Sequence, residues 1–291
     1  MSFKETISIV KVQDNSDIFE SVKSGLKLIG NPAFRQDDVV AIKPNLCCIK
    51  GTETGATTDL RVVEAIIRFL QEEYHVLDIS IVESDGTQVL ADMAFKLLGY
   101  EALSKKLNVK LINLSKSPFS YRVCEKNTFL KKIKVPDILE RANCLISVPK
   151  IKIHTLCSFG GTMKNQFGCN PVAKKSIYHS RLQESMVDLT CVFKPHIIVV
   201  DGIVGMEGRG PVSGIPVKMN ALIFGKDAVA VDHLIARLIG VNPKKVKYLV
   251  EAQKRGLGTT DYQIVGASLE ETKRHFNCPP SKNNLYGLFS I

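Results

Sequence analysis

The chain has 291 residues, of which 45% are hydrophobic and 23% charged, so it can bury one large core or two of ordinary size, and global disorder is excluded. Its net charge of +10 suits a partner of opposite sign, either a nucleic acid or a small anion. No apolar run reaches the roughly 18 residues of a membrane span, and the N-terminal MSFKETISIVKV lacks a signal-peptide layout, so we expect a cytoplasmic protein without a membrane partner.

Strand and helix patterns alternate along the first part of the chain. In order, the patterns predict a strand at 7–12, a helix from about Ser16 to Leu28, a strand at 38–45, a helix from Thr58 or Asp59 to about Leu70, a strand at 78–84, a helix ending near Gly99 and a strand at 109–114. This β-α-β order is typical of a parallel sheet with helices on both faces.

Residues 115–136 interrupt the alternation, because they are polar, rich in lysine and carry two prolines. They predict a hairpin excursion or a hinge. The patterns that follow are strands at 144–148, 196–202 and 220–225 and helices near 181–193, 227–239 and 243–255. We predict an α/β fold with a mainly parallel, doubly wound sheet and two lobes around a cleft, the first lobe being 1–120 and the second 121–291, with the C-terminal helices in the second lobe.

Many of the basic residues lie in 104–134, where a nucleic-acid-binding module is one interpretation. Aromatic residues are not interleaved with these lysines in the way that base stacking requires. We therefore expect a solvated basic face or attraction of a small anionic ligand, and do not expect nucleic acid as the partner.

Eight cysteines in a chain of this length do not predict a disulfide scaffold. They form no C-x-x-C pair, so their spacing predicts no metal site and no intrinsic iron–sulfur cluster. Cys144 and Cys191 lie in apolar runs and are expected in the core. An alternative hypothesis is a metal or iron–sulfur carrier for electron transfer that uses Cys47, Cys48, Cys157 and Cys169.

Four predicted strands end in polar residues, and ligands of open parallel sheets bind beyond the carboxyl ends of the strands. Each of these four polar stretches contributes one residue near its start to a predicted common cleft. These residues are Lys43, Ser84, Lys150 and Asp201. The glycine-rich 201–211 is followed by PVSGIP, which cannot begin the helix that a dinucleotide site needs, so a Rossmann site is excluded. We expect a flexible loop over the cleft there, or a plain surface turn.

The segment PKIKIHTLCSFGGTMKNQFG (149–168) places lysines and a histidine directly after a buried strand. The side chains predicted to form the site are His154, Lys164 and His179 as catalytic groups, with Lys43, Asn45, Ser84, Lys150, Gly160, Gly161 and Asp201 binding substrate or cofactor. In this interpretation the two histidines exchange protons, Lys43 and Lys150 hold a carboxylate or phosphate, and Lys164 is an anion clamp or an activated amine. The alternative is that His154 caps a turn and the lysines are solvated.

Several segments together resemble the DUF362 family over about residues 38–258. They are KPNL (43–46), TDLRVVEAIIRFL (58–70), VPKIKIHTLCSFGGTMKNQFG (148–168), DGIVGMEGRGP (201–211) and DAVAVDHLIA (227–236). The biochemistry of that family is unassigned. Many members carry an appended ferredoxin-like module, which implies redox chemistry and an electron-transfer partner, but this chain has no C-x-x-C-x-x-C run.

A more distant resemblance is to the nickel-pincer lactate racemase family. ESDGTQ (83–88) resembles that family's G-T-H-type turn, with Gln88 in place of the histidine, and His154, Gly160-Gly161, Lys164 and His179 resemble its later motif in order. The resemblance implies cofactor or substrate binding and proton shuttling between two α/β lobes. We predict an enzyme with isomerase-like proton transfer or oxidoreductase activity on a small anionic ligand, whose cofactor the sequence does not identify.

Overall fold

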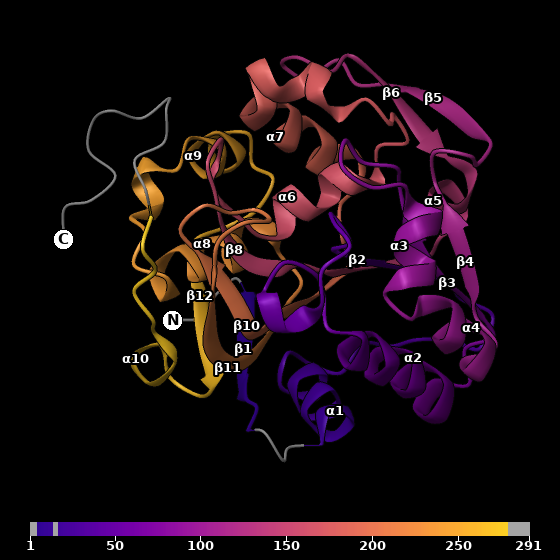
Figure 1. Cartoon of the computed structure of the whole chain (residues 1–291), viewed down its shortest axis with the longest axis horizontal. Helices are drawn as coiled ribbons and strands as arrows, with labels where there is room; N and C mark the ends of the chain where they lie inside the picture. Colours follow the sequence, from indigo (N-terminus) through magenta and orange to yellow (C-terminus); the bar gives the residue numbers. More distant parts are fainter. Residues whose placement is uncertain (1–4, 14–16, 279–291) are drawn as a thin grey trace.

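The computed structural model describes residues 5–13 and 17–278, and its centre is one ten-stranded sheet (Figure 1). The strand order is β12 (Tyr262–Gly266), β1 (Glu5–Lys11), β11 (Ile215–Gly225), β10 (Ile197–Glu207), β7 (Cys144–Val148), β2 (Val39–Pro44), β3 (Asp78–Glu83) and β4 (Lys110–Asn113). Beyond this path, β8 (Lys150–His154) pairs with β10 and with β9 (Ser158–Gly160). Most pairs are parallel, and the antiparallel ones are β1–β11, β10–β11 and β8–β9, which confirms the predicted mainly parallel α/β fold.

Two apolar cores lie on opposite faces of the sheet, because successive strand residues point to opposite sides. In β2, for example, Ala41 belongs to one core and its neighbours Val40 and Ile42 to the other. The Val40 face is covered by α1 (Ile18–Leu28), α2 (Leu60–Tyr74), α3 (Ala91–Leu97) and α4 (Tyr100–Leu107). The Ala41 face is covered by α5 (Asp137–Arg141), α6 (Thr162–Gln166), α7 (Leu182–Val192), α8 (Ala228–Leu238) and α9 (Lys247–Lys254). Figure 1 shows α1 and α2 below the sheet and α6 and α7 above it.

Helix starts follow the capping residues that the sequence offers. Asp59 caps α2 by accepting a hydrogen bond from Arg61 N, and Asp227 caps α8 by accepting from Val229 N and Ala230 N. Of the two predicted starts for α2, Asp59 is the cap. The predicted start of α1 at Ser16 lies outside the described residues, and Asp17 is the cap there. The remaining short helices are η1 (Thr52–Thr54), η2 (Phe167–Cys169), η3 (Lys175–Arg181), η4 (Pro243–Lys245) and α10 (Leu269–Thr272).

The lysine-rich interruption is a hairpin of β5 (Phe119–Val123) and β6 (Lys132–Pro136), at the upper right of Figure 1. Its outer face is exposed and carries Phe119 and Tyr121. Lys132 Nζ lies 4.1 Å from the Tyr121 ring centroid, and Lys134 Nζ lies 4.2 Å from that of Phe119. The expectation that aromatic residues are not interleaved with these lysines is therefore wrong, because antiparallel pairing places side by side residues that lie apart in the sequence.

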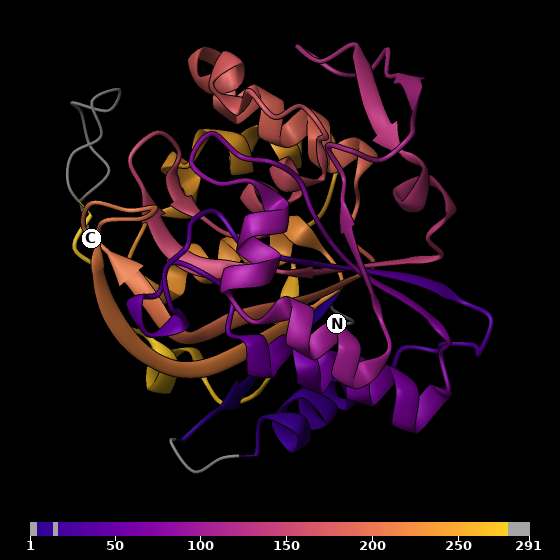
Figure 2. The same cartoon turned by 45° about the vertical axis from the view of Figure 1, so that its right-hand side comes forward.

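The segment 201–211 is mainly strand, and the expectation of a flexible loop there is wrong. β10 continues to Glu207 and pairs with β11 from Ile215, so only the hairpin tip at 208–214 is a turn (Figure 2). Its glycines serve close strand packing: a Cβ on Gly205 would lie 2.9 Å from Ile151 O, and one on Gly202 would lie 2.8 Å from Ala221 O.

Strands from both predicted lobes belong to the same sheet, since β1 lies between β11 and β12. The division into 1–120 and 121–291 stays a prediction. Across the described ranges, no helix combines the length and apolar character needed to cross a bilayer.

Candidate functional site

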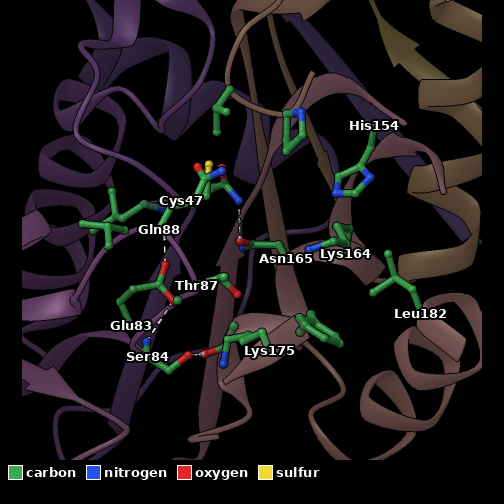
Figure 3. A pocket seen from close by; sticks show the side chains of 18 of the residues that line it. Cys47, Glu83, Ser84, Thr87, Gln88, His154, Lys164, Asn165, Lys175 and Leu182 are labelled. Atoms are coloured by element: carbon green, nitrogen blue, oxygen red, sulfur yellow. Dashed lines mark hydrogen bonds between the residues drawn. The ribbon is translucent and has the colours of Figure 1, made fainter. Parts of the chain in front are cut away.

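A pocket of about 280 Å³ opens beyond the carboxyl ends of β2, β3 and β8 (Figure 3). Residues after these strands form part of its wall, and α6, η3 and the tip of the β10–β11 hairpin complete it. The polar and charged residues that line it include Lys43, Asn45, Cys47, Glu83, Ser84, Gln88, His154, Lys164, Asn165, Lys175 and His179. The hairpin tip contributes Pro211 and Val212.

The structure brings six of the predicted site residues to this pocket and leaves four outside its lining. The six are Lys43, Asn45, Ser84, His154, Lys164 and His179, and the four are Lys150, Gly160, Gly161 and Asp201. Sequence analysis did not include Glu83, Asn165 and Lys175 among the site residues, and it named Cys47 only as a ligand in the metal or iron–sulfur alternative. Glu83 is the last residue of β3 and Cys47 follows the end of β2 by three residues, and these positions were the available signal.

Lys150 and Asp201 form a buried ion pair instead of lining the cleft. Lys150 Nζ lies 2.8 Å from Asp201 Oδ2, and neither side chain reaches solvent. Asp201 also accepts hydrogen bonds from Asp59 N and Ile203 N. The expectation that these two residues contact a ligand is wrong, because each already neutralises the other in the core.

Gly161 makes room for a protein side chain, because a Cβ there would lie 2.5 Å from Asp232 Oδ1. A Cβ on Gly160 would be in ordinary contact with Lys152 Cγ at 3.5 Å. Asp232 accepts hydrogen bonds from Thr162 N at 2.6 Å and Met163 N at 3.0 Å and so holds the start of α6. The close approach that Gly161 permits is therefore that of a carboxylate on α8, not of a ligand.

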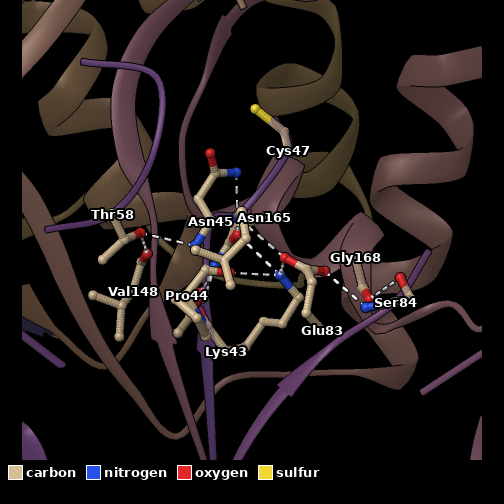
Figure 4. A network of polar contacts seen from close by, with 12 residues as sticks. Lys43, Pro44, Asn45, Cys47, Thr58, Glu83, Ser84, Val148, Asn165 and Gly168 are labelled. Carbon is tan, nitrogen blue, oxygen red and sulfur yellow. Dashed lines mark hydrogen bonds and ion pairs between the residues drawn. The ribbon is translucent and has the colours of Figure 1, made fainter. Parts of the chain in front are cut away.

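Lys43 is neutralised within the protein as well. Its Nζ donates to Glu83 Oε2 at 2.7 Å and to Pro44 O at 2.6 Å, as Figure 4 shows. Glu83 also accepts from Leu46 N and Ser84 N. This pair fixes the ends of β2 and β3 to each other, and Glu83, the one carboxylate that the described residues contribute to the pocket lining, is thereby occupied.

Two other lysines in the lining form no ion pair with a carboxylate of the described residues. Lys164 is half-buried and lies 4.8 Å from the Phe167 ring centroid, and within residues 5–13 and 17–278 it makes no hydrogen bond or ion pair. Lys175 donates only to the carbonyl oxygens of Asn170 and Val172. Burial lowers the pKa of both ammonium groups, that of Lys175 to about 8. Within the described residues, therefore, neither ammonium group has an ion-pair partner.

His154 is a hydrogen-bond donor toward the pocket. Leu156 N donates to its Nδ1 at 3.2 Å, which assigns the proton of the neutral ring to Nε2. Burial, and then the charges of Lys164, Lys152 and His179, hold the pKa of His154 well below its usual range. The neutral imidazole thus offers an Nε2–H, whereas His179 on η3 is exposed at the rim.

Cys47 faces the same pocket and contacts a third lysine. Lys152 is buried, and its Nζ donates to Asn45 Oδ1 at 2.7 Å, Ala56 O at 2.8 Å and Cys47 Sγ at 3.1 Å. A hydrogen bond from the Cys48 thiol and the charges of Lys152 and Lys164 hold the pKa of the Cys47 thiol well below its usual range.

All eight cysteines are free thiols. Cys191 is exposed, against the expectation of a core position, because its apolar run forms a helix of which one side faces solvent. Cys157 and Cys169 are buried in the apolar core, where burial raises the pKa of each to about 12. Among the residues that the structure describes, no three His, Cys, Asp or Glu side chains are grouped so as to hold a metal.

Comparison with known proteins identifies the family. Residues 40–237 match the family described as "Domain of unknown function (DUF362)". The chain belongs to the DUF362 family. This confirms the prediction from the five motifs.

Two known proteins show how far the likeness reaches. The thylakoid-associated protein sll1697 of Synechocystis sp. is 23% identical over 281 residues, covering 89% of this chain and 82% of that protein. The lactate racemase apoprotein of Thermoanaerobacterium thermosaccharolyticum aligns with a TM-score of 0.40 and 10% identity, covering 76% of this chain and 54% of that one. The chain thus spans about half the length of the racemase, and so distant a likeness carries no argument about chemistry. The predicted cytoplasmic location stays a prediction.

Proposed function

We propose that this DUF362 protein is an enzyme that binds a small carboxylate or phosphate in the pocket of Figure 3. The observation that carries the proposal is the ammonium group of Lys164, which is half-buried in the lining and makes no hydrogen bond or ion pair within the described ranges. A charge withdrawn from water is costly unless it meets an opposite charge. An anionic ligand supplies that charge.

The other pocket groups suit the same ligand. The Nε2–H of His154 can donate to a ligand oxygen, and the ammonium of Lys175 adds positive charge nearby. The lowered pKa of Lys164 also makes its amine a usable acid or base, and His179 can exchange that proton with solvent. Proton transfer to or from the ligand is the chemistry that these residues support best.

Equilibrium binding tests the anion site. We expect inorganic phosphate or acetate to bind the wild-type protein in calorimetric titrations, and Lys164→Met to weaken binding by roughly tenfold to a hundredfold, the range expected for one charge-assisted hydrogen bond. Lys110→Met is the matched control, because Lys110 pairs with Asp78 at the surface, on the β4 edge of the sheet. Unchanged binding in Lys164→Met, with the fold intact, would refute the proposal.

One observation favours a second candidate, binding of nucleic acid. The exposed face of the β5–β6 hairpin alternates aromatic rings with lysines, an arrangement that stacks bases and contacts phosphates. The double variant Tyr121→Ser/Lys132→Ser should then be retained less on a column of single-stranded DNA, and its retention should depend less on the salt concentration. If the wild-type protein is not retained on single-stranded DNA at low salt, this candidate is eliminated.

A further inference from the structure

Three buried lysines lie on β2 and β8, and two of them have a carboxylate partner. Lys43 is paired with Glu83 and Lys150 with Asp201, at 2.7 and 2.8 Å. Lys152, only 3% exposed, has no carboxylate partner among the described residues. Its three contacts are two neutral oxygens and the sulfur of Cys47, so Cys47 occupies the position that a carboxylate occupies beside the other two lysines.

The shortest contact of the Cys47 sulfur is with an ammonium group. Lys152 Nζ donates to it at 3.1 Å. Cys47 Sγ also lies 3.6 Å from Ala56 O, the contact that a protonated thiol would make, and this contact is the longer of the two. The shorter contact is that of a thiolate stabilised by a buried ammonium.

We propose that Cys47 is a nucleophilic thiolate, ion-paired to Lys152, that forms a covalent bond with a small anion carrying an electrophilic carbon. Cys47 is half-buried and lines the pocket, where Figure 3 shows it across from His154. The preference for an anion rests on the proposed function, since Lys164 is the group that attracts it. In the covalent step the sulfur lone pair forms the S–C bond, and the leaving group departs with the pair of the bond that breaks.

The charged and titratable groups that act on Cys47 are the Cys48 thiol and the ammonium groups of Lys152 and Lys164. Both charges are positive, and both favour the thiolate. The contact with Cys47 and burial raise the pKa of the Cys48 thiol. Of the two cysteines, Cys47 is the one that lines the pocket and contacts Lys152.

Alkylation with neutral iodoacetamide tests the thiolate independently of anion binding. The reaction is followed by peptide mass spectrometry at about pH 6.5. Cys47 should react roughly tenfold faster than exposed Cys191 in the same molecule, because the larger thiolate fraction of Cys47 outweighs its lower intrinsic nucleophilicity. Cys48→Ala should leave Cys47 the fastest-reacting thiol and move its pH midpoint upward. Lys152→Met should raise that midpoint by at least about one pH unit.

The wild-type measurement decides the proposal even if Lys152→Met does not fold. A Cys47 that reacts no faster than Cys191 would overturn the proposal. Anionic iodoacetate, in which iodide leaves as the S–C bond forms, then tests the ligand class. The ratio of the iodoacetate rate to the iodoacetamide rate should be higher at Cys47 than at Cys191. Lys164→Met should abolish this difference between the two cysteines. Fast alkylation by both reagents with no preference would keep the thiolate but refute the anionic ligand.

Discussion

At the scale of single residues, the site is organised by how each lysine is balanced. Lys43 and Lys150 have carboxylates, Lys152 has the sulfur of Cys47, and Lys164 has no polar partner in the described chain. The residue types after the strands identified the region, but could not show which lysine is left unbalanced. That depends on Glu83, Asp201 and Cys47, which lie far from their partners in the sequence and are brought to them by the sheet.

Gly168 tests the packing around the Lys43–Glu83 pair. A Cβ there would lie 2.5 Å from Lys43 Cε and 2.8 Å from Glu83 Oε1, so Gly168→Ala should lower the free energy of unfolding by about 1–3 kcal/mol. Gly86→Ala is the control, because its Cβ would meet only Val89 O at 3.6 Å. Chemical denaturation measures both. Equal stability of the two variants would contradict the packing described.

Lys175 gives anion binding a pH dependence of defined sign. Burial lowers its pKa to about 8, so its ammonium is charged below that pH and loses its charge above it. Affinity for inorganic phosphate should therefore fall as the pH rises through about 8. In Lys175→Met this step should disappear, while any dependence due to Lys164 stays. Calorimetric titrations between about pH 6.5 and 9 measure it, and a step that persists in the variant would assign it to another group.

At the scale of elements, ion pairs connect neighbouring strands, and glycines allow the strands to approach each other closely. The strand alternation and the start of α2 were readable from the sequence, because they depend on local periodicity and on a single capping residue, Asp59. The long β10–β11 hairpin was not, because Gly202 and Gly205 look like loop residues until the close approach of Ala221 and Ile151 is known. The same limit applies to the exposed aromatic face of β5–β6, which exists only once the strands pair.

The Lys150–Asp201 pair should connect β8 to β10 without contributing to ligand binding. Lys150→Met should cost about 3–5 kcal/mol of stability, because it leaves a buried carboxylate unpaired. The double variant Lys150→Met/Asp201→Asn should recover part of that loss. Denaturation measures stability, and calorimetry should find phosphate affinity of the folded variants unchanged. Loss of binding in the folded double variant would return these residues to the site.

At the scale of the whole molecule, one sheet with an apolar core on each face positions the pocket at the carboxyl ends of β2, β3 and β8. The α/β class and the mainly parallel sheet could be predicted from the alternation of elements. The position of β1 between β11 and β12 could not, because nothing local in the sequence of β1 specifies partners that follow it by more than 200 residues.

This position of β1 predicts that the chain unfolds as a unit. Residues 1–120 lack both strands that flank β1, so expressed alone they should not give a cooperative transition. The full chain should show one transition in urea by far-ultraviolet circular dichroism. Two separate transitions, or a folded 1–120 fragment, would instead support two independent lobes.

The most direct test of the central claim, that the pocket holds an anion at Lys164, is a crystal structure grown with selenate. The anomalous signal of selenium locates the anion independently of the protein coordinates. We predict a selenate whose oxygens lie within hydrogen-bond distance of Lys164 Nζ and His154 Nε2. A fully ordered structure with no selenate in the pocket, or with Lys164 paired to a protein carboxylate, would contradict the claim.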